Sequence, residues 1–94
     1  MDFLNPEFMR QVRAARGLLG WSQKDLSDSS GVSLSTLNRL ERGDGDPSVN
    51  SLRLIYKAFE QAGIRFVSSD DGGVGVILTK DGLLRAATDG KLSG

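Results

Sequence analysis

Apolar residues in the first two thirds of the chain recur at helical spacing. One stripe runs from Phe8 to Leu19 at steps of four, three and four residues, and a second runs from Leu52 to Ala62 at steps of three, four and three. Such steps place the apolar side chains on one face of a helix. A glycine follows each stripe directly, as is common where helices end. The pattern therefore predicts two amphipathic helices.

Serines mark where three helices begin, at Ser22, Ser33 and Ser48. A serine hydroxyl before a helix accepts a hydrogen bond from a free backbone N–H of the first turn. The first of these serines has Asp25 three residues later, a variant of the capping box. Gly31 and Gly43 can take the positive φ that ends a helix. We therefore predict short helices over 23–29 and 34–42, separated by a tight turn, before the longer helix after Ser48.

The period changes after Gly63. The β-branched and aromatic runs 64–67 and 74–79 are separated by a turn-rich segment, which predicts two short strands. A two-stranded unit is marginal by itself, so it must pack on the helices or pair with another chain. In the last segment, 80–94, Leu83 and Leu84 stand among glycines and charges. We expect that tail to be frayed or disordered.

Composition excludes several classes of protein. Ninety-four residues suit one domain, and the lack of cysteine and histidine removes disulfides, Cys/His zinc sites and imidazole-based catalysis. We expect no metal, no cofactor and no enzyme activity, since nothing assembles a nucleophile, a base and an oxyanion site. No apolar run is long enough to span a membrane and no signal leader is evident, so we expect a soluble cytoplasmic protein without a membrane partner.

The zero net charge hides an asymmetry. Between Met9 and Arg65 there are nine basic and six acidic residues, so neutrality comes from the two flanks. A small positive excess is only weakly indicative of nucleic-acid binding, because a mixed solvated surface gives the same count. The first eight residues precede a second Met and include Glu7-Phe8, which an in-frame cloning site commonly encodes. We expect 1–8 to be a vector-derived leader.

The two short helices and their flanks resemble a known family. The runs Leu19-Gly20-Trp21-Ser22-Gln23-Lys24-Asp25-Leu26-Ser27 and Gly31-Val32-Ser33-Leu34-Ser35-Thr36-Leu37-Asn38-Arg39-Leu40-Glu41-Arg42-Gly43 are similar to the helix-turn-helix domain of phage repressor and Cro-like regulators, of the xenobiotic-response-element type. The resemblance covers about Arg10 to Gly63. It implies a mainly α fold, with a four-helix repressor-like domain over 9–63 followed by a short two-stranded β extension over 64–79.

The resemblance makes the helix after Ser33 the one that enters the major groove of double-stranded DNA. Its exposed positions give the expected base-reading residues Leu34, Ser35, Asn38 and Arg39. Arg39 is the strongest candidate, because a guanidinium binds guanine O6 and N7 together. Leu34 stands where many family members have a polar residue, so it is expected to meet a thymine methyl. Without the helix-turn-helix resemblance, Arg39 would be interpreted as an ordinary solvated charge.

Phosphate contacts are expected around the same unit. By resemblance Gln23 binds a backbone phosphate at the positive end of its helix. The full expected set is Gln23, Lys24, Ser33, Thr36 and Arg42. The loop after the third helix carries Asp44 and Asp46 where the family often has basic residues. Repulsion between these carboxylates and the DNA phosphates is expected to weaken non-specific binding. The resemblance also makes Arg16 and Glu41 a partly buried ion pair, for which we expect a structural role.

Two functions from different classes fit these features. The first is a sequence-specific transcriptional regulator, expected to be a repressor, that binds a partly palindromic operator as a homodimer. Its dimer interface is expected on the strands, at Phe66, Val67, Val76 and Ile77, because isologous pairing would satisfy an exposed edge. The alternative is an antitoxin or anti-activator module that holds a protein partner, such as a toxin or co-regulator, with DNA binding secondary. The acidic loop and the tail after Thr79 motivate that alternative.

Overall fold

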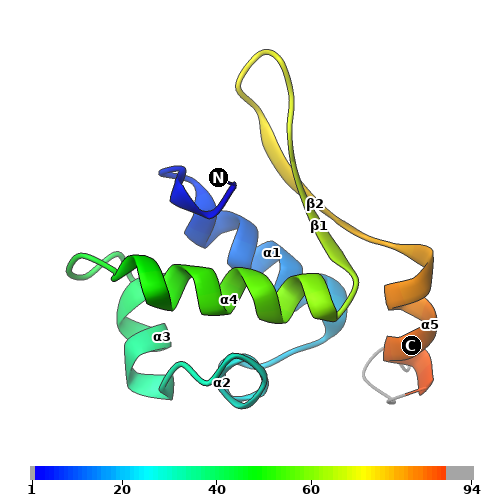
Figure 1. Ribbon diagram of the computed structural model, residues 1–94, viewed down its shortest axis with the longest axis horizontal. Helices are drawn as coiled ribbons and strands as arrows, with labels where there is room; N and C mark the ends of the chain where they lie inside the picture. The colour runs from blue at the N-terminus through cyan, green and yellow to red at the C-terminus, as the bar shows by residue number, and fades with distance from the viewer. Residues whose placement is uncertain (1, 89–94) are drawn as a thin grey trace.

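The computed structural model describes residues 2–88 and is mainly helical, with one two-stranded antiparallel sheet after the helical domain (Figure 1). This architecture confirms the fold class that the sequence predicts. In Figure 1, α1 and α4 lie together, α2 and α3 lie on the opposite side of α4, and α5 lies at the far end from α3. The elements are η1 Asp2–Leu4, α1 Phe8–Leu19, α2 Gln23–Ser30, α3 Leu34–Glu41, α4 Val49–Gln61, β1 Ile64–Ser68, β2 Val74–Leu78 and α5 Lys80–Thr88.

The three predicted serine caps are present. The hydroxyl of Ser22 accepts from the N–H of Asp25 at 3.0 Å, and the Asp25 carboxylate accepts from the N–H of Ser22 at 2.9 Å. Ser33 and Ser48 cap α3 and α4 in the same way, each accepting from the backbone N–H three residues later. Gly31 takes a φ of +81° after α2, so the chain turns directly into α3. Local side-chain chemistry therefore fixes the helix boundaries around the turn.

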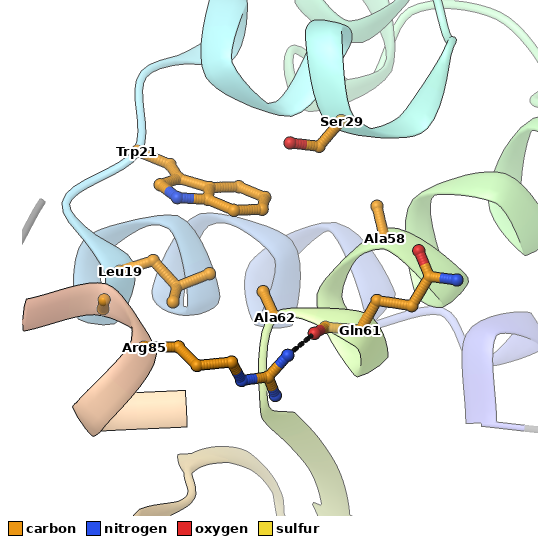
Figure 2. Close-up of a pocket in the computed structure, with 8 residues that line it drawn as sticks. Leu19, Trp21, Ser29, Ala58, Gln61, Ala62 and Arg85 are labelled. Atoms are coloured by element: carbon orange, nitrogen blue, oxygen red, sulfur yellow. Dashed lines mark hydrogen bonds between the residues drawn. The ribbon is translucent and has the colours of Figure 1, made fainter. Parts of the chain in front are cut away.

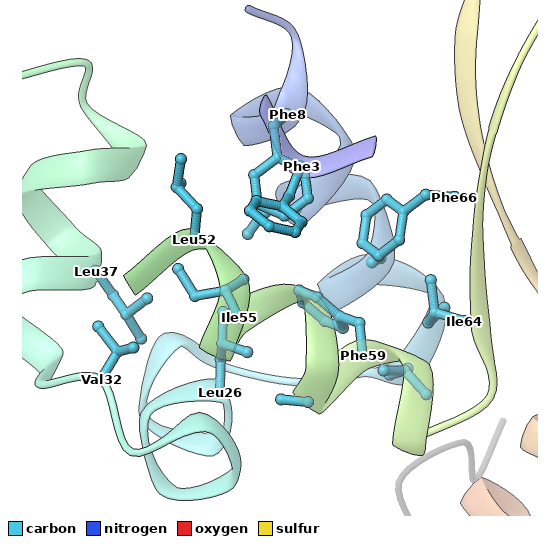
Figure 3. Packing of buried hydrophobic residues seen from close by; sticks show 14 of the residues in the cluster. Phe3, Phe8, Leu26, Val32, Leu37, Leu52, Ile55, Phe59, Ile64 and Phe66 are labelled. Carbon is cyan, nitrogen blue, oxygen red and sulfur yellow. The ribbon is translucent and has the colours of Figure 1, made fainter. Parts of the chain in front are cut away.

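The apolar faces of the helices meet in one core (Figure 3). Phe59 of α4 lies fully buried at its centre, stacked on Trp21 with ring centroids 5.6 Å apart and in edge contact with Phe66 of β1 at 6.0 Å. Phe66 also contacts Phe8 at 5.3 Å. Offset and edge-on ring pairs add to what area burial contributes. The aromatic cluster thus joins the start of the helical domain to the hairpin.

Part of the segment expected to be a leader contributes to this core. Phe3 is buried and lies against Tyr56 of α4, with ring centroids 5.4 Å apart. The side-chain oxygen of Asn5 accepts from the N–H of Glu7 at 2.7 Å, which holds the turn that leads into α1. Phe3 therefore packs as part of the core, between Phe8 of α1 and Tyr56 of α4.

The β hairpin is fastened to α1 by a buried amide. β1 and β2 pair with Phe66 opposite Val76, and Ile64 and Phe66 point into the core. The side-chain amide of Gln11 donates to the carbonyls of Gly75 at 2.9 Å and Val67 at 3.4 Å, one on each strand. A buried amide needs such partners, and here both strands supply them. Gln11 therefore sets where the hairpin lies on the helical domain.

The hairpin tip is closed by side-chain contacts of its own. The carboxylate of Asp71 accepts from the Ser69 hydroxyl and from the N–H of Gly73. These two hydrogen bonds, the Ser69 bond foremost, lower the pKa of Asp71. Hydrogen bonds to the charged form of a carboxyl have this effect because they are weakened on protonation.

The expectation of a disordered tail is wrong for residues 80–88, which form helix α5. The reason is a contact between two glycines that are 19 positions apart in sequence. Gly82 packs on Gly63 so closely that a Cβ built on Gly63 would lie 2.3 Å from the Cα of Gly82. Thr79 completes the junction, because its hydroxyl donates to the Gly63 carbonyl at 2.9 Å and accepts from the Gly82 N–H. The expectation for 89–94 lies outside the described residues.

No helix within residues 2–88 has both the length and the apolar character needed to cross a membrane.

The glycine junction gives a stability prediction with a matched control. Gly63 and Gly72 share a φ of +92°, but only Gly63 has neighbours where a Cβ would lie. We expect Gly63→Ala to lower the free energy of unfolding by about 2–4 kcal/mol, and Gly72→Ala by about 1 kcal/mol from backbone strain alone. Urea denaturation of both variants measures the difference. Equal losses would mean that the close approach of α5 contributes nothing.

Candidate nucleic-acid interface

Helix α3 has one buried face and one free face. Leu37 and Leu40 point into the core. The four residues expected to read bases, Leu34, Ser35, Asn38 and Arg39, are all exposed. Helical spacing puts them together opposite the buried leucines. The structure therefore brings the predicted base-reading set onto a single solvent-facing surface of α3.

The polar side chains of that surface form no hydrogen bond or ion pair with the part of the chain that the structure describes. Among residues 2–88, Arg39 forms no ion pair and no side-chain hydrogen bond. A guanidinium with five donors and no internal acceptor must hydrogen-bond to water or to a ligand. Leu34, at the start of α3, is 43% exposed, so its side chain is open to an apolar contact. The surface has the donors and the apolar contact that base edges in the major groove accept.

The expected phosphate-contacting residues flank this surface. Gln23 is the first residue of α2, where backbone N–H groups point outward at the positive end of the helix. Ser33 and Thr36 lie at the start of α3, where the Ser33 hydroxyl donates to the Thr36 hydroxyl at 2.8 Å.

Both expected phosphate-binding cations already pair with acids. Lys24 lies 3.0 Å from Asp28, and Arg42 lies 3.2 Å from Asp44 of the acidic loop. Both pairs are exposed, so each is weak and can exchange for another anion. The pairing still lowers the net positive charge that a duplex would meet.

The predicted pair of Arg16 and Glu41 is present and bidentate. Arg16 Nη2 and Nε lie 2.7 and 3.1 Å from the two Glu41 carboxylate oxygens, and the two side chains are 20% and 5% exposed. Arg16 Nη1 also donates to the Trp21 carbonyl at 3.1 Å, and Arg13 donates to the Glu41 carbonyl at 2.9 Å. One guanidinium thus ties α1 to the start of the α1–α2 link and to the end of α3.

The residues expected at a dimer interface are divided by the hairpin's two faces. Phe66 is only 6% exposed, and Val76 packs against the same core. Phe66 is therefore not available to a partner, because the aromatic cluster already covers it. Val67 is partly buried, whereas Ile77 is 40% exposed. Of the expected set, Ile77 is the residue that the fold leaves open.

Some contacts of the site were not expected from sequence. Arg13 and the Trp21 carbonyl complete the Arg16–Glu41 cluster. Arg13 lies three residues before Arg16, so helical spacing could have placed both on one side of α1. The contact of Arg16 with the Trp21 carbonyl could not be predicted, because every residue type offers the same backbone acceptor. Among residues 2–88, no three His, Cys, Asp or Glu side chains gather as they would around a metal ion.

Helices α2 and α3, joined by a tight turn and with the second helix exposed, form the helix-turn-helix class of DNA-binding unit. A family model described as helix-turn-helix matches residues 12–61, which is more than half of the chain. The chain belongs to the Cro/C1-type helix-turn-helix family, a family of DNA-binding transcription regulators. A search among curated proteins gives no match.

The ion pair gives the second prediction. We expect Glu41→Ala to lower the free energy of unfolding by about 3–5 kcal/mol, because the Arg16 guanidinium is left without its carboxylate. Glu60→Ala, at an exposed position of α4, is the matched control, with an expected loss within about 0.5 kcal/mol. Thermal and urea unfolding measure both. If Glu41→Ala kept its stability and lost only DNA affinity, the pair would be a binding element and not a structural one.

Proposed function

We propose that the protein is a sequence-specific transcriptional repressor that binds an inverted-repeat operator as a homodimer. The observation that carries this proposal is the free face of α3, where Arg39 lies exposed opposite a buried apolar face and has no ion pair or side-chain hydrogen bond among residues 2–88. A helix held rigidly on one side and polar on the other suits insertion into a major groove.

Each residue of that face has a role that follows from its chemistry. Arg39 donates two parallel hydrogen bonds to a guanine, and Asn38 pairs with an adenine edge or a phosphate. Leu34 packs on a thymine methyl, and Ser35 donates to or accepts from a neighbouring base. The apolar contact at Leu34 gives this protein a base preference different from a regulator with a polar residue there.

Phosphate contacts set the position of α3 on the duplex. The start of α2, with Gln23, offers backbone N–H groups to one phosphate. Lys24 and Arg42 exchange their acidic partners for phosphates when the duplex docks. Because Asp28 and Asp44 compete for these cations, binding to random DNA is weak and has a shallow salt dependence.

A dimer supplies the remaining specificity. A single short helix touches few base pairs, whereas two copies related by a two-fold axis read two half-sites. The outward side of the hairpin, with Ile77 and Val67, is the contact surface that we assign to the partner copy. Occupation of an operator by such a dimer represses transcription by excluding other proteins from that DNA.

Selection of binding sites from random duplex DNA tests the base-reading role. We expect the protein to enrich an inverted repeat and Arg39→Ala to bind that site about 5- to 150-fold more weakly, as loss of one bidentate base contact implies. Arg10→Ala changes an exposed arginine of α1 that lies outside both the α3 surface and the hairpin, so it is the control and keeps the affinity. Failure of the wild-type protein to enrich any sequence at low salt would contradict the proposal and favour a protein partner.

Sedimentation equilibrium tests the dimer. We expect Ile77→Lys to raise the dimer dissociation constant at least tenfold, because a charge replaces the apolar contact on the hairpin. Val49→Lys changes another exposed apolar residue, at the start of α4, and leaves the dissociation constant unchanged. An Ile77→Lys variant that is still fully dimeric would refute this interface. Shortening the chain at Gly63 is a poorer test, because it removes Ile64 and Phe66 from the core.

A further inference from the structure

A cavity of about 310 Å³ lies where α5 meets the helix-turn-helix domain (Figure 2). Its lining comes from four helices and the α1–α2 link: the ends of α1 and α4, one residue of α2, and α5. Its size is at the lower end of the range for small-molecule sites, so it suits a ligand with a single ring. None of the proposed DNA-contacting or dimer residues lines it.

The lining combines a flat apolar wall with a polar rim. The Trp21 ring is held in place by stacking on Phe59 and also borders the cavity. Three alanines, including Ala62, border the space where larger side chains would fill it. Figure 2 shows Ser29, Gln61 and Arg85 around the same hollow. An indole face accepts a planar ring, and a guanidinium accepts a carboxylate.

Arg85 places a positive charge at the rim of the cavity, and this charge is able to pair with a ligand. Within residues 2–88, no acidic side chain lines the cavity. Arg85 donates to the carbonyl of Gln61, which holds the guanidinium at the rim, and it also pairs with Asp81 at 3.2 Å. The Arg85 and Asp81 side chains are 50% and 81% exposed, so this ion pair is weak. A ligand carboxylate can take the place of Asp81 without undocking α5.

We propose that this cavity is a binding site for a small aromatic carboxylate. The ring lies against Trp21, and the carboxylate accepts from Arg85, with Ser29 and Gln61 as further hydrogen-bonding groups. Ligand binding is also coupled to the position of α3. The Trp21 carbonyl accepts a hydrogen bond from Arg16, and Arg16 holds Glu41 at the end of α3. This regulatory part rests on the proposed DNA-binding function, whereas ligand binding itself does not.

The single tryptophan of the chain makes ligand binding directly measurable. Titration with phenylacetate is expected to change the Trp21 fluorescence saturably. Phenylacetamide, which keeps the ring without the charge, and acetate, which keeps the charge without the ring, are expected to bind at least tenfold more weakly. The absence of a saturable change with phenylacetate, or equal affinity for phenylacetamide, would overturn the proposal.

Variants locate the site. Arg85→Gln is expected to weaken phenylacetate about 10- to 100-fold through loss of a charge-assisted hydrogen bond. Ala62→Leu is expected to abolish binding by filling the cavity. The matched controls Arg65→Gln and Ala87→Leu change exposed residues outside the lining and keep the wild-type affinity. Circular dichroism checks each fold, and Arg85→Gln decides the question by itself if Ala62→Leu does not fold. An unchanged affinity in Arg85→Gln would place the ligand elsewhere.

DNA titrations with and without phenylacetate test the coupling to α3. We expect saturating phenylacetate to change the affinity for the selected duplex at least fivefold in the wild-type protein and not in Arg85→Gln. An unchanged DNA affinity in a protein that binds phenylacetate would refute the coupling and leave the ligand site standing. A protein that binds no DNA would refute the proposed function, and the fluorescence titration would still decide the site.

Discussion

The bidentate contact of Arg16 with Glu41 is the interaction on which the placement of α3 depends. Helix α3 has only eight residues and buries two leucines, so packing alone gives it little restraint. The ion pair fixes its C-terminal end to α1, and the Arg16 bond to the Trp21 carbonyl fixes the chain that leads into α2. A nearly buried carboxylate must keep its partner, which makes this arrangement strongly preferred over any other. The free face of α3 points to solvent as a consequence.

The segment after α4 completes the domain and does not simply trail from it. The family match ends at residue 61, yet Ile64 and Phe66 belong to the core and Gln11 fastens both strands to α1. The Gly63–Gly82 contact then brings α5 back onto the end of α4. The same closure forms the cavity beside Trp21. Packing of the appended elements therefore connects the core, the cavity and the residues that hold α3.

Features that depend on residues close together in sequence could be predicted, whereas features that depend on contacts between distant segments could not. The serine caps depend on residues three apart, so the helix boundaries were predictable, and the Arg16–Glu41 pair came from the family resemblance. Helix α5 was missed because Gly82 reads as a helix breaker until its contact with Gly63 is known. Phe66 was assigned to an interface because nothing local reveals that Phe8 and Phe59 cover it. The pairing of Arg42 with Asp44 likewise depends on the loop's path.

We propose above all that α3 lies in the major groove of a specific duplex. Amide chemical shifts of the labelled protein, followed during titration with the selected inverted repeat, test it most directly. We expect the largest changes along α3, centred on Asn38 and Arg39, with a second group at the start of α2 near Gln23. Residues of the hairpin tip, 69–73, should not shift on DNA binding. Changes confined to the hairpin or α5, with α3 unaffected, would mean that α3 does not bind the duplex.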